Sequence, residues 1–149
     1  MKHVMNPLIA QSYAGQFASG PMARFLQEVG TEMQGAPLPA GITLGDTRQC
    51  FRNAANGVLN YGFEYWEGLA WDPRCGSLPF HHAWLVDPET NQVRDVTWRD
   101  ASAATYLGVH VTTNVLIENL LKTEIYGVLD KGLSFERPTA DGRGPLGLA

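Results

Sequence analysis

Three residues that are far apart in the sequence carry side chains that could together attack an acyl group. They are Cys50, a histidine in the stretch FHHAW, and Asp95 in the stretch VRDVT. A cysteine is a nucleophile only as its thiolate, which is favoured near a helix N-terminus and beside an imidazolium. A histidine can take up and return a proton, and a carboxylate behind it fixes the tautomer and orientation of the ring. These residue types therefore predict nucleophilic catalysis at a thiol.

The element expected to position Cys50 is a helix over residues 47–60. Asp46 is the expected N-cap, and Gln49 follows three residues later, as in a capping box. Cys50 would then lie at the fourth helical position, close to the free backbone N–H groups that could stabilise an oxyanion. Gln49 is a candidate oxyanion donor as well as a capping residue.

The hairpin that follows decides which histidine faces Asp95. A four-residue loop between its strands suits the proline at the start and the asparagine at the end of the loop. With this loop, or with a two-residue turn, His82 and Asp95 share one face of the sheet. A three-residue loop would select His81 instead, but it would favour Gly or Asn in place of Thr90. His82 is therefore the predicted partner of Asp95.

Three further candidates for substrate contact come from the aromatic-rich strands. Trp84 shares the expected face of His82, so it is predicted to line the cleft. Trp66 and Glu67 lie in the stretch YWEGLAW. For Glu67 a solvated strand face is the default interpretation, and substrate contact is the alternative. Cys75 lies in an expected loop and is interpreted as a free thiol.

The remaining pattern predicts helices first and then strands that are adjacent in sequence. This order is typical of an α+β fold with an antiparallel sheet. The expected elements are a helix over 21–34, a loop over 35–45, strands over 61–71, 80–86, 92–98 and 106–111, and a last helix that begins after Thr112 or Thr113 and ends near Gly127. Residues 1–20 have no clear pattern, and the Gly/Pro-rich residues 137–149 are expected to form a loose tail.

Composition indicates one compact domain over residues 1–149. Of the 149 residues 44% are hydrophobic, 17% are charged, 16 are glycine and 9 are proline. A chain of this length can bury a core without a metal or a disulfide. The net charge of −4, without a cluster of Lys or Arg, argues against a nucleic-acid partner. A sparsely charged surface beside many strand aromatics suits a protein or peptide partner better.

The same sequence gives expectations about location. No apolar run approaches the about 20 residues of a membrane span, so no membrane partner is expected. The N-terminal stretch lacks the continuous apolar core of a signal peptide. Two cysteines are too few for a disulfide framework, which favours reduced thiols and a cytoplasmic location. A phage or mobile-element protein that acts inside its host cell fits equally well. The sequence carries no signal for an oligomeric state.

The order and spacing of the three residues resemble the transglutaminase-like branch of the papain-like thiol enzymes. His82-Ala83-Trp84 and Asp95-Val96-Thr97 are similar to the H-A-W and D-x-T pattern of that family, and the resemblance covers roughly residues 46–111. It implies a nucleophile helix packed on an antiparallel sheet, with Cys50 as nucleophile, His82 as general base and acid, and Asp95 as the orienting carboxylate. Arylamine N-acetyltransferases share this order, but the chain lacks the arginine–glycine-rich stretch that they carry before the cysteine.

The implied reaction is acyl transfer at a thiol, with no metal and no organic cofactor. A hydrolase of an amide or isopeptide bond in a protein or peptide is the first expectation, as a peptidase, amidase or deamidase. A transglutaminase-like or N-acyl transferase is the second. The alternative of another class is a non-catalytic protein-binding module or inhibitor on the same fold.

Overall fold

The fold is that of a computed structural model, which describes residues 21–75 and 79–129. The expectations for residues 1–20 and 137–149 lie outside these ranges. The elements in chain order are α2 (Pro21–Val29), β1 (Thr31–Gln34), α3 (Cys50–Tyr61), β2 (Glu64–Trp71), the 3-10 helix η1 (Pro73–Cys75), β3 (Phe80–Asp87), β4 (Gln92–Arg94), β5 (Thr105–Val111) and α4 (Thr113–Thr123). None of the described helices is long and apolar enough to cross a membrane.

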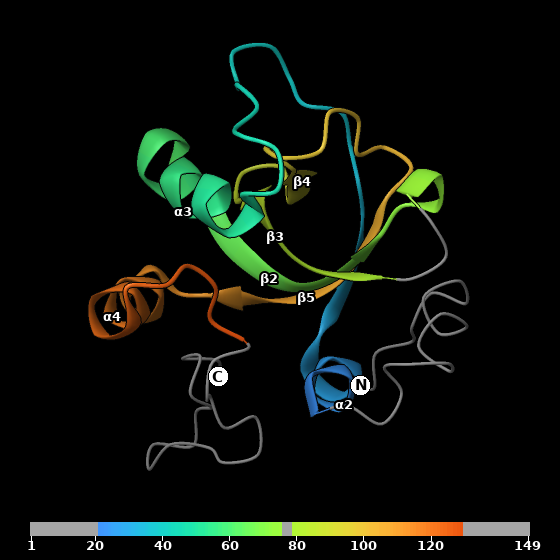
Figure 1. The fold of residues 1–149 in the computed structure, drawn as a ribbon. Helices are drawn as coiled ribbons and strands as arrows, with labels where there is room; N and C mark the ends of the chain where they lie inside the picture. The colour runs from blue at the N-terminus through green and yellow to red at the C-terminus, as the bar shows by residue number, and fades with distance from the viewer. Residues whose placement is uncertain (1–20, 76–78, 130–149) are drawn as a thin grey trace.

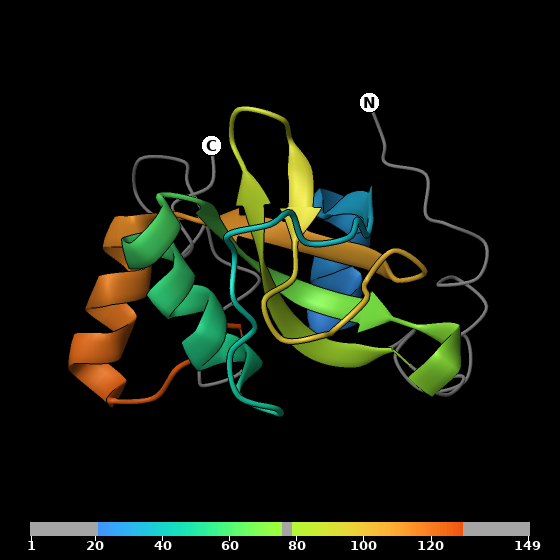
Figure 2. The ribbon, with the colours of Figure 1, turned by 90° about the horizontal axis from the view of Figure 1, so that it is seen from above.

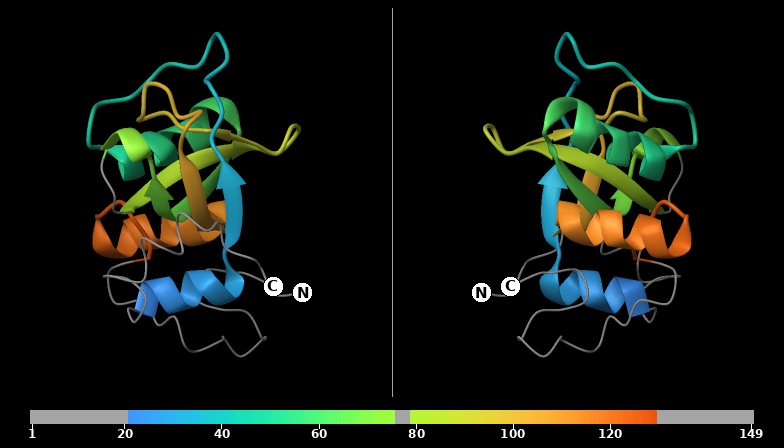
Figure 3. Two further views of the ribbon diagram at one scale, coloured as in Figure 1. Left: turned by 90° about the vertical axis from the view of Figure 1, so that its right-hand side faces the viewer. Right: turned by 90° about the vertical axis from the view of Figure 1, so that its left-hand side faces the viewer.

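The strands form one five-stranded antiparallel sheet in the order β1-β5-β2-β3-β4. Figure 1 shows that this sheet is strongly curled and that α3 lies over its β2 and β3 strands. The predicted α+β class with an antiparallel sheet is therefore confirmed. Figure 2 places α3 and α4 at one end of the sheet and α2 nearer the other end, and the side views of Figure 3 show the same three helices against the strands.

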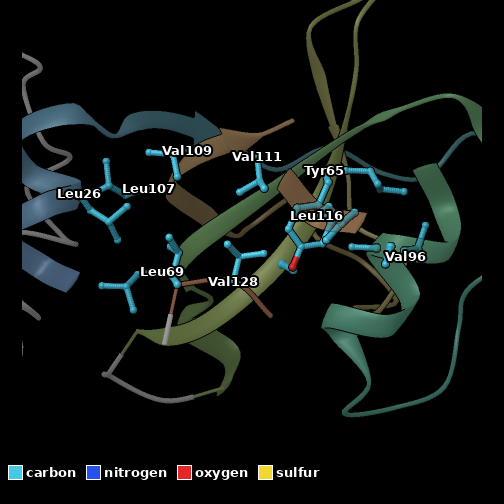
Figure 4. Close-up of a cluster of buried hydrophobic side chains, with 14 residues drawn as sticks. Leu26, Tyr65, Leu69, Val96, Leu107, Val109, Val111, Leu116 and Val128 are labelled. Carbon is cyan, nitrogen blue, oxygen red and sulfur yellow. The ribbon is translucent and has the colours of Figure 1, made fainter. Parts of the chain in front are cut away.

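Alternating strand residues build two buried clusters on the two faces of the sheet. The cluster on the helix side contains Leu26 of α2, Ala54 of α3 and Leu116 of α4, and Figure 4 shows part of it. On the opposite face Trp84 and Tyr106 are fully buried with smaller apolar residues. Because both faces are covered, polar side chains of the central strands are buried unless they reach a strand end.

The first expected helix is shorter than predicted. It ends at Val29, and residues 31–34 form the edge strand β1, so Met33 lies on a strand. The Gly30 amide donates to the Leu26 carbonyl at 2.8 Å, and a Cβ at Gly30 would lie 2.4 Å from that carbonyl oxygen. The chain turns at the residue that can make this close approach, which apolar spacing alone does not reveal.

The predicted hairpin loop is confirmed. Asp87 pairs with Gln92, and Asn91 has a left-handed φ of 60° with its N–H bonded to the Asp87 carbonyl at 2.7 Å. Strand β4 pairs only with the last three residues of β3, residues 85–87. In the described sheet, the first half of β3 therefore has a strand neighbour only in β2, and its other side is open to α3 and to the chain after β4.

Two glycines let the central strands approach closely. Gly68 of β2 is paired with Gly108 of β5. A Cβ at Gly68 would lie 2.2 Å from the Leu107 carbonyl oxygen, and one at Gly108 would lie 2.4 Å from the Trp84 ring. Gly68 therefore allows the close approach of the β5 backbone, and Gly108 leaves room for the buried indole of Trp84.

Candidate active site

Cys50 is the first residue of α3, three positions closer to the helix start than predicted. Gln49 is at the N-cap position, but its side chain makes no capping hydrogen bond. The prediction that Asp46 caps the helix is wrong, because its carboxylate pairs with Arg52 at 2.7 Å. Arg48 has a left-handed φ of 65°, which prevents a helix from starting before it. The sulfur therefore lies in the first helical turn, where the helix dipole favours negative charge.

His82 and Asp95 are hydrogen-bonded in the protein interior. The His82 Nε2 atom lies 2.8 Å from Asp95 Oδ2, and Tyr106 donates its hydroxyl to the same oxygen at 2.7 Å. The other carboxylate oxygen accepts the backbone N–H groups of Thr97 and Trp98 at 2.9 and 3.0 Å. Four donors thus surround a carboxylate that has no solvent exposure.

The same hydrogen bonds explain why a predicted strand is too long. The sequence pattern predicts a strand over 92–98, but β4 ends at Arg94. The Asp95 carboxylate accepts the N–H groups of Thr97 and Trp98, two of the four residues that the predicted strand contains beyond Arg94. Asp95 therefore both ends the strand and turns its own side chain toward His82.

The His82 ring is fixed by its aromatic neighbours. Trp98 stacks on it with ring centroids 4.3 Å apart and an interplanar angle of 20°. Trp84 and Tyr106 lie further away, with centroids at 6.3 and 6.2 Å. Trp84 shares the face of His82, as predicted, but it is fully buried and does not line the cavity beside the ring.

The electrostatics of the pair favour the charged forms. Burial of the ring lowers the pKa of His82, but the charge and hydrogen bond of Asp95, with further contributions from Cys50, raise it to about 9. Burial alone would raise the pKa of Asp95, but the His82 charge and the surrounding donors lower it. Burial followed by the Asp95 charge raises the pKa of Tyr106 well above 10. His82 is thus an imidazolium at neutral pH, opposite a carboxylate.

Cys50 and His82 open into one cavity of about 370 Å³. Because Nε2 of His82 is bonded to Asp95, Nδ1 is the ring nitrogen left for the thiol, and Cys50 is among the groups that raise the pKa of His82. The lining residues are Thr47, Arg48, Cys50, Phe51, Phe80, His81, His82, Thr97 and Trp98. A second cavity of about 220 Å³, beside the middle of α3, contains none of the three predicted residues.

Glu67 does not lie on a solvated strand face, and it does not line the cavity. It has no solvent exposure, and its oxygens accept the Tyr65 hydroxyl at 2.6 Å and the N–H groups of Val128 and Leu129 at 2.8 Å each. The His81 Nε2 atom lies 2.7 Å from the same carboxylate. Glu67 therefore joins β3 to the segment that follows α4.

The other predicted contact residues do not line the cavity. Trp66 donates its indole N–H to Glu64 at 3.2 Å and stacks on His110 with centroids 5.9 Å apart. Gln49 is exposed beside the cavity but is not among its lining residues. Cys75 is the last residue of η1. No group of three or more His, Cys, Asp or Glu in the described ranges could hold a metal ion.

The structure adds Tyr106 and Trp98, which the sequence analysis missed, and it gives His81, considered there only as the alternative to His82, a place in the cavity. Tyr106 belongs to β5, which the sheet order separates from β3 by β2, so no local pattern connects it to Asp95. The sequence did contain a signal for Trp98 and His81, because Trp98 lies three residues after Asp95 and His81 lies next to His82. Both residues belong to the site because they line the cavity, and the sequence does not reveal where the cavity lies.

Comparison of the chain with protein-family models, with curated proteins and with solved structures gives no match. Its chemistry is therefore inferred from the geometry described above. The described residues place a thiol at a helix start, a buried imidazolium beside it, and a carboxylate with four donors behind the imidazolium. A thiol and an imidazole in one cavity can carry out acyl transfer.

Proposed function

We propose that this protein is a cysteine-dependent acyl-transfer enzyme that hydrolyses an amide or isopeptide bond in a protein or peptide. The observation that carries the proposal is the His82 imidazole, which is bonded to Asp95 through Nε2 and interacts with Cys50 in a shared cavity. The curled antiparallel sheet with a cysteine at the start of its covering helix supports a papain/transglutaminase-like fold.

The first half-reaction forms a thioester on Cys50. An imidazolium beside a cysteine favours the thiolate, which attacks the carbonyl carbon of the substrate. As the tetrahedral intermediate collapses, the C–N bond breaks and His82 Nδ1 gives its proton to the leaving amine. Asp95 keeps the ring in the tautomer with hydrogen on Nε2, so that Nδ1 does the proton transfer.

The second half-reaction releases the acyl group. Neutral His82 takes a proton from water, the hydroxide oxygen bonds to the thioester carbonyl, and the C–S bond breaks to regenerate the thiolate and the imidazolium. The oxyanion of both intermediates lies near the start of α3. The first N–H groups of a helix have no intrahelical acceptor, so those of Cys50 and Phe51 are its candidate donors.

The test uses p-nitrophenyl acetate as a generic acyl donor and intact-mass spectrometry of acid-quenched protein, with the modified residue located by peptide mapping. We expect acetylation of Cys50 and its subsequent hydrolysis in the wild type, no acetylation at this position in Cys50→Ala, and slow acetylation in His82→Ala. His110→Ala is the matched control, because His110 lies on β5 outside the cavity lining. Equal acetylation of Cys50 in the wild type and His82→Ala would refute the proposal.

Transfer to an amine is the second candidate, supported by the rings of Phe51, Phe80 and Trp98 in the cavity wall. Apolar walls can exclude water and so give an amine time to reach the thioester. Butylamine added to the same assay separates the two reactions, because a transferase forms N-butylacetamide and a hydrolase forms acetate.

A further inference from the structure

A second imidazole in the same cavity has a buried carboxylate of its own. His81 contacts Glu67, and Glu67 also accepts a tyrosine hydroxyl, that of Tyr65. This repeats the arrangement at His82, on the other face of β3, with different strands supplying the partners. The reaction proposed above uses only His82 and leaves His81 without a role.

The hydrogen bonds of Glu67 fix the tautomer of His81. Oε2 of Glu67 accepts backbone N–H groups from Val128 at 3.1 Å and from Leu129 at 2.8 Å. An oxygen that accepts from two backbone donors is an acceptor for the ring as well, so His81 donates from Nε2. In the neutral ring the remaining nitrogen, Nδ1, is an acceptor. Among the described residues, the hydrogen bond of the His81 ring is the one that Nε2 makes to Glu67, so Nδ1 is left for a ligand.

The position of the ring is set as firmly as its tautomer. Phe51, the residue after the nucleophile, meets His81 edge-on with centroids 4.8 Å apart and an interplanar angle of 61°. The His81 side chain keeps 22% of its surface exposed, and it lines the cavity together with Cys50. The charge of Cys50 also contributes, after burial and Glu67, to the raised pKa of Tyr65. His81 therefore faces the same cavity as the sulfur.

A purely structural role does not account for His81. Without the imidazole, Glu67 still has three donors, from Tyr65, Val128 and Leu129. What the pair does supply is a ring with one nitrogen fixed as a donor toward the core and the other left as an acceptor.

We infer that His81 determines specificity for amides that carry an N–H group. Its Nδ1 accepts a hydrogen bond from the N–H of a primary or secondary amide bound beside Cys50, so esters and tertiary amides lack this contact. The inference rests on the proposed function, since it assigns the substrate class of the same site. It excludes proline-type tertiary amides as good substrates.

The test compares two electrophiles that differ only in this group: N-benzyl-2-chloroacetamide and its N-methyl derivative. The second-order rate constant for alkylation of Cys50 is measured for both by peptide mapping, and glutathione gives their intrinsic reactivity ratio. Relative to glutathione, we expect the wild type to favour the N–H compound by roughly tenfold, the worth of one hydrogen bond. His81→Phe loses this preference. His81→Gln keeps it, because its amide can donate to Glu67 while its oxygen faces the cavity.

A wild-type ratio equal to that of glutathione overturns the inference, and so does an unchanged ratio in His81→Phe. The ratio of the two alkylation rate constants does not depend on turnover. If the proposed function fails instead, acetylation of Cys50 does not depend on His82. A lost preference in His81→Phe, together with His82-dependent acetylation of Cys50 in the otherwise unchanged chain, supports both assignments. A structural role alone would lower the stability of His81→Phe but would leave the ratio unmoved.

Discussion

Replacing Asp95 by asparagine is predicted to remove the imidazolium form of His82 at neutral pH. The pKa of His82 is about 9, against 6.5 for an ordinary histidine, although burial lowers it. That difference corresponds to about 3 kcal/mol in favour of the charged ring, or roughly three hundredfold in its proton affinity. Asparagine keeps the shape and the acceptor for the Thr97 and Trp98 N–H groups but loses the charge. The pKa of His82 should then fall below 6.5.

The substitution also changes the tautomer. The asparagine NH₂ group would donate to Nε2 of His82, which places the hydrogen on Nδ1, the nitrogen left for Cys50. A neutral ring that already carries a proton on Nδ1 cannot accept one from the thiol there. Acetylation of Cys50 by p-nitrophenyl acetate should slow accordingly.

The assay is NMR titration of histidine rings labelled with ¹³C and ¹⁵N. In the wild type we expect one midpoint near 9, with the neutral ring protonated at Nε2. In Asp95→Asn that midpoint should lie below 6.5, with the hydrogen on Nδ1. Asp100→Asn is the matched control, because Asp100 is exposed and accepts from Ser102 outside the site. A midpoint that stays above 8 in Asp95→Asn would contradict the assignment of the raised pKa to this carboxylate.

Three further predictions concern stability in urea. Tyr106→Phe removes one of the four donors of buried Asp95 and should lower the free energy of unfolding by about 1–3 kcal/mol; an unchanged midpoint would show that the bond contributes nothing. Because the pKa of His82 is raised on folding, the ring stabilises the folded state fully below pH 6.5, and this stabilisation is lost as the pH rises through about 9. The free energy of unfolding of the wild type should therefore fall by about 3 kcal/mol over this range. In His82→Gln this fall should be absent, and an equal fall in the variant would contradict the assignment to His82. Gly68→Ala places a Cβ 2.2 Å from the Leu107 carbonyl oxygen and should cost about 1–3 kcal/mol, and wild-type stability in this variant would mean that the strands can separate freely.

Local sequence was enough to predict the hairpin and the pair that it holds. The proline and asparagine of the loop set the register in which Asp87 pairs with Gln92, and the register puts His82 on the face of Asp95. A side-chain period of two leaves little freedom once the loop length is known. The turn residues and the alternation of strand side chains were therefore sufficient to predict the His82–Asp95 pair.

The helix start was predicted less well, because two arrangements of Asp46 have the same local signature. An aspartate four residues before the cysteine can cap a helix, but here its carboxylate pairs with the Arg52 side chain and Gln49 occupies the N-cap position. The left-handed Arg48 that decides between them is a rare conformation for a residue with a side chain. The predicted helix start was wrong by three residues, but the prediction that Cys50 lies in this helix was correct.

Contacts between distant segments could not be predicted. Tyr106 reaches Asp95 only because of the sheet order, and Glu67 meets Val128 and Leu129 about sixty residues further along the chain. A glutamate between aromatic residues looks like a solvated position on a strand. Its burial is stabilised by backbone donors from Val128 and Leu129, which lie on a distant segment that no local pattern connects to it.

The donors around Asp95 have a consequence for how the sequence could drift over generations. Asp95 joins β3, the turn after β4, and β5, so its loss would harm the folded state whether or not any reaction is selected. Cys50 is half-buried and free, so a small residue could replace it at little cost to folding. A library passed through a screen for folded protein alone should keep the aspartate and lose the cysteine. The cysteine position, not the aspartate, is therefore the one whose retention would record selection for chemistry.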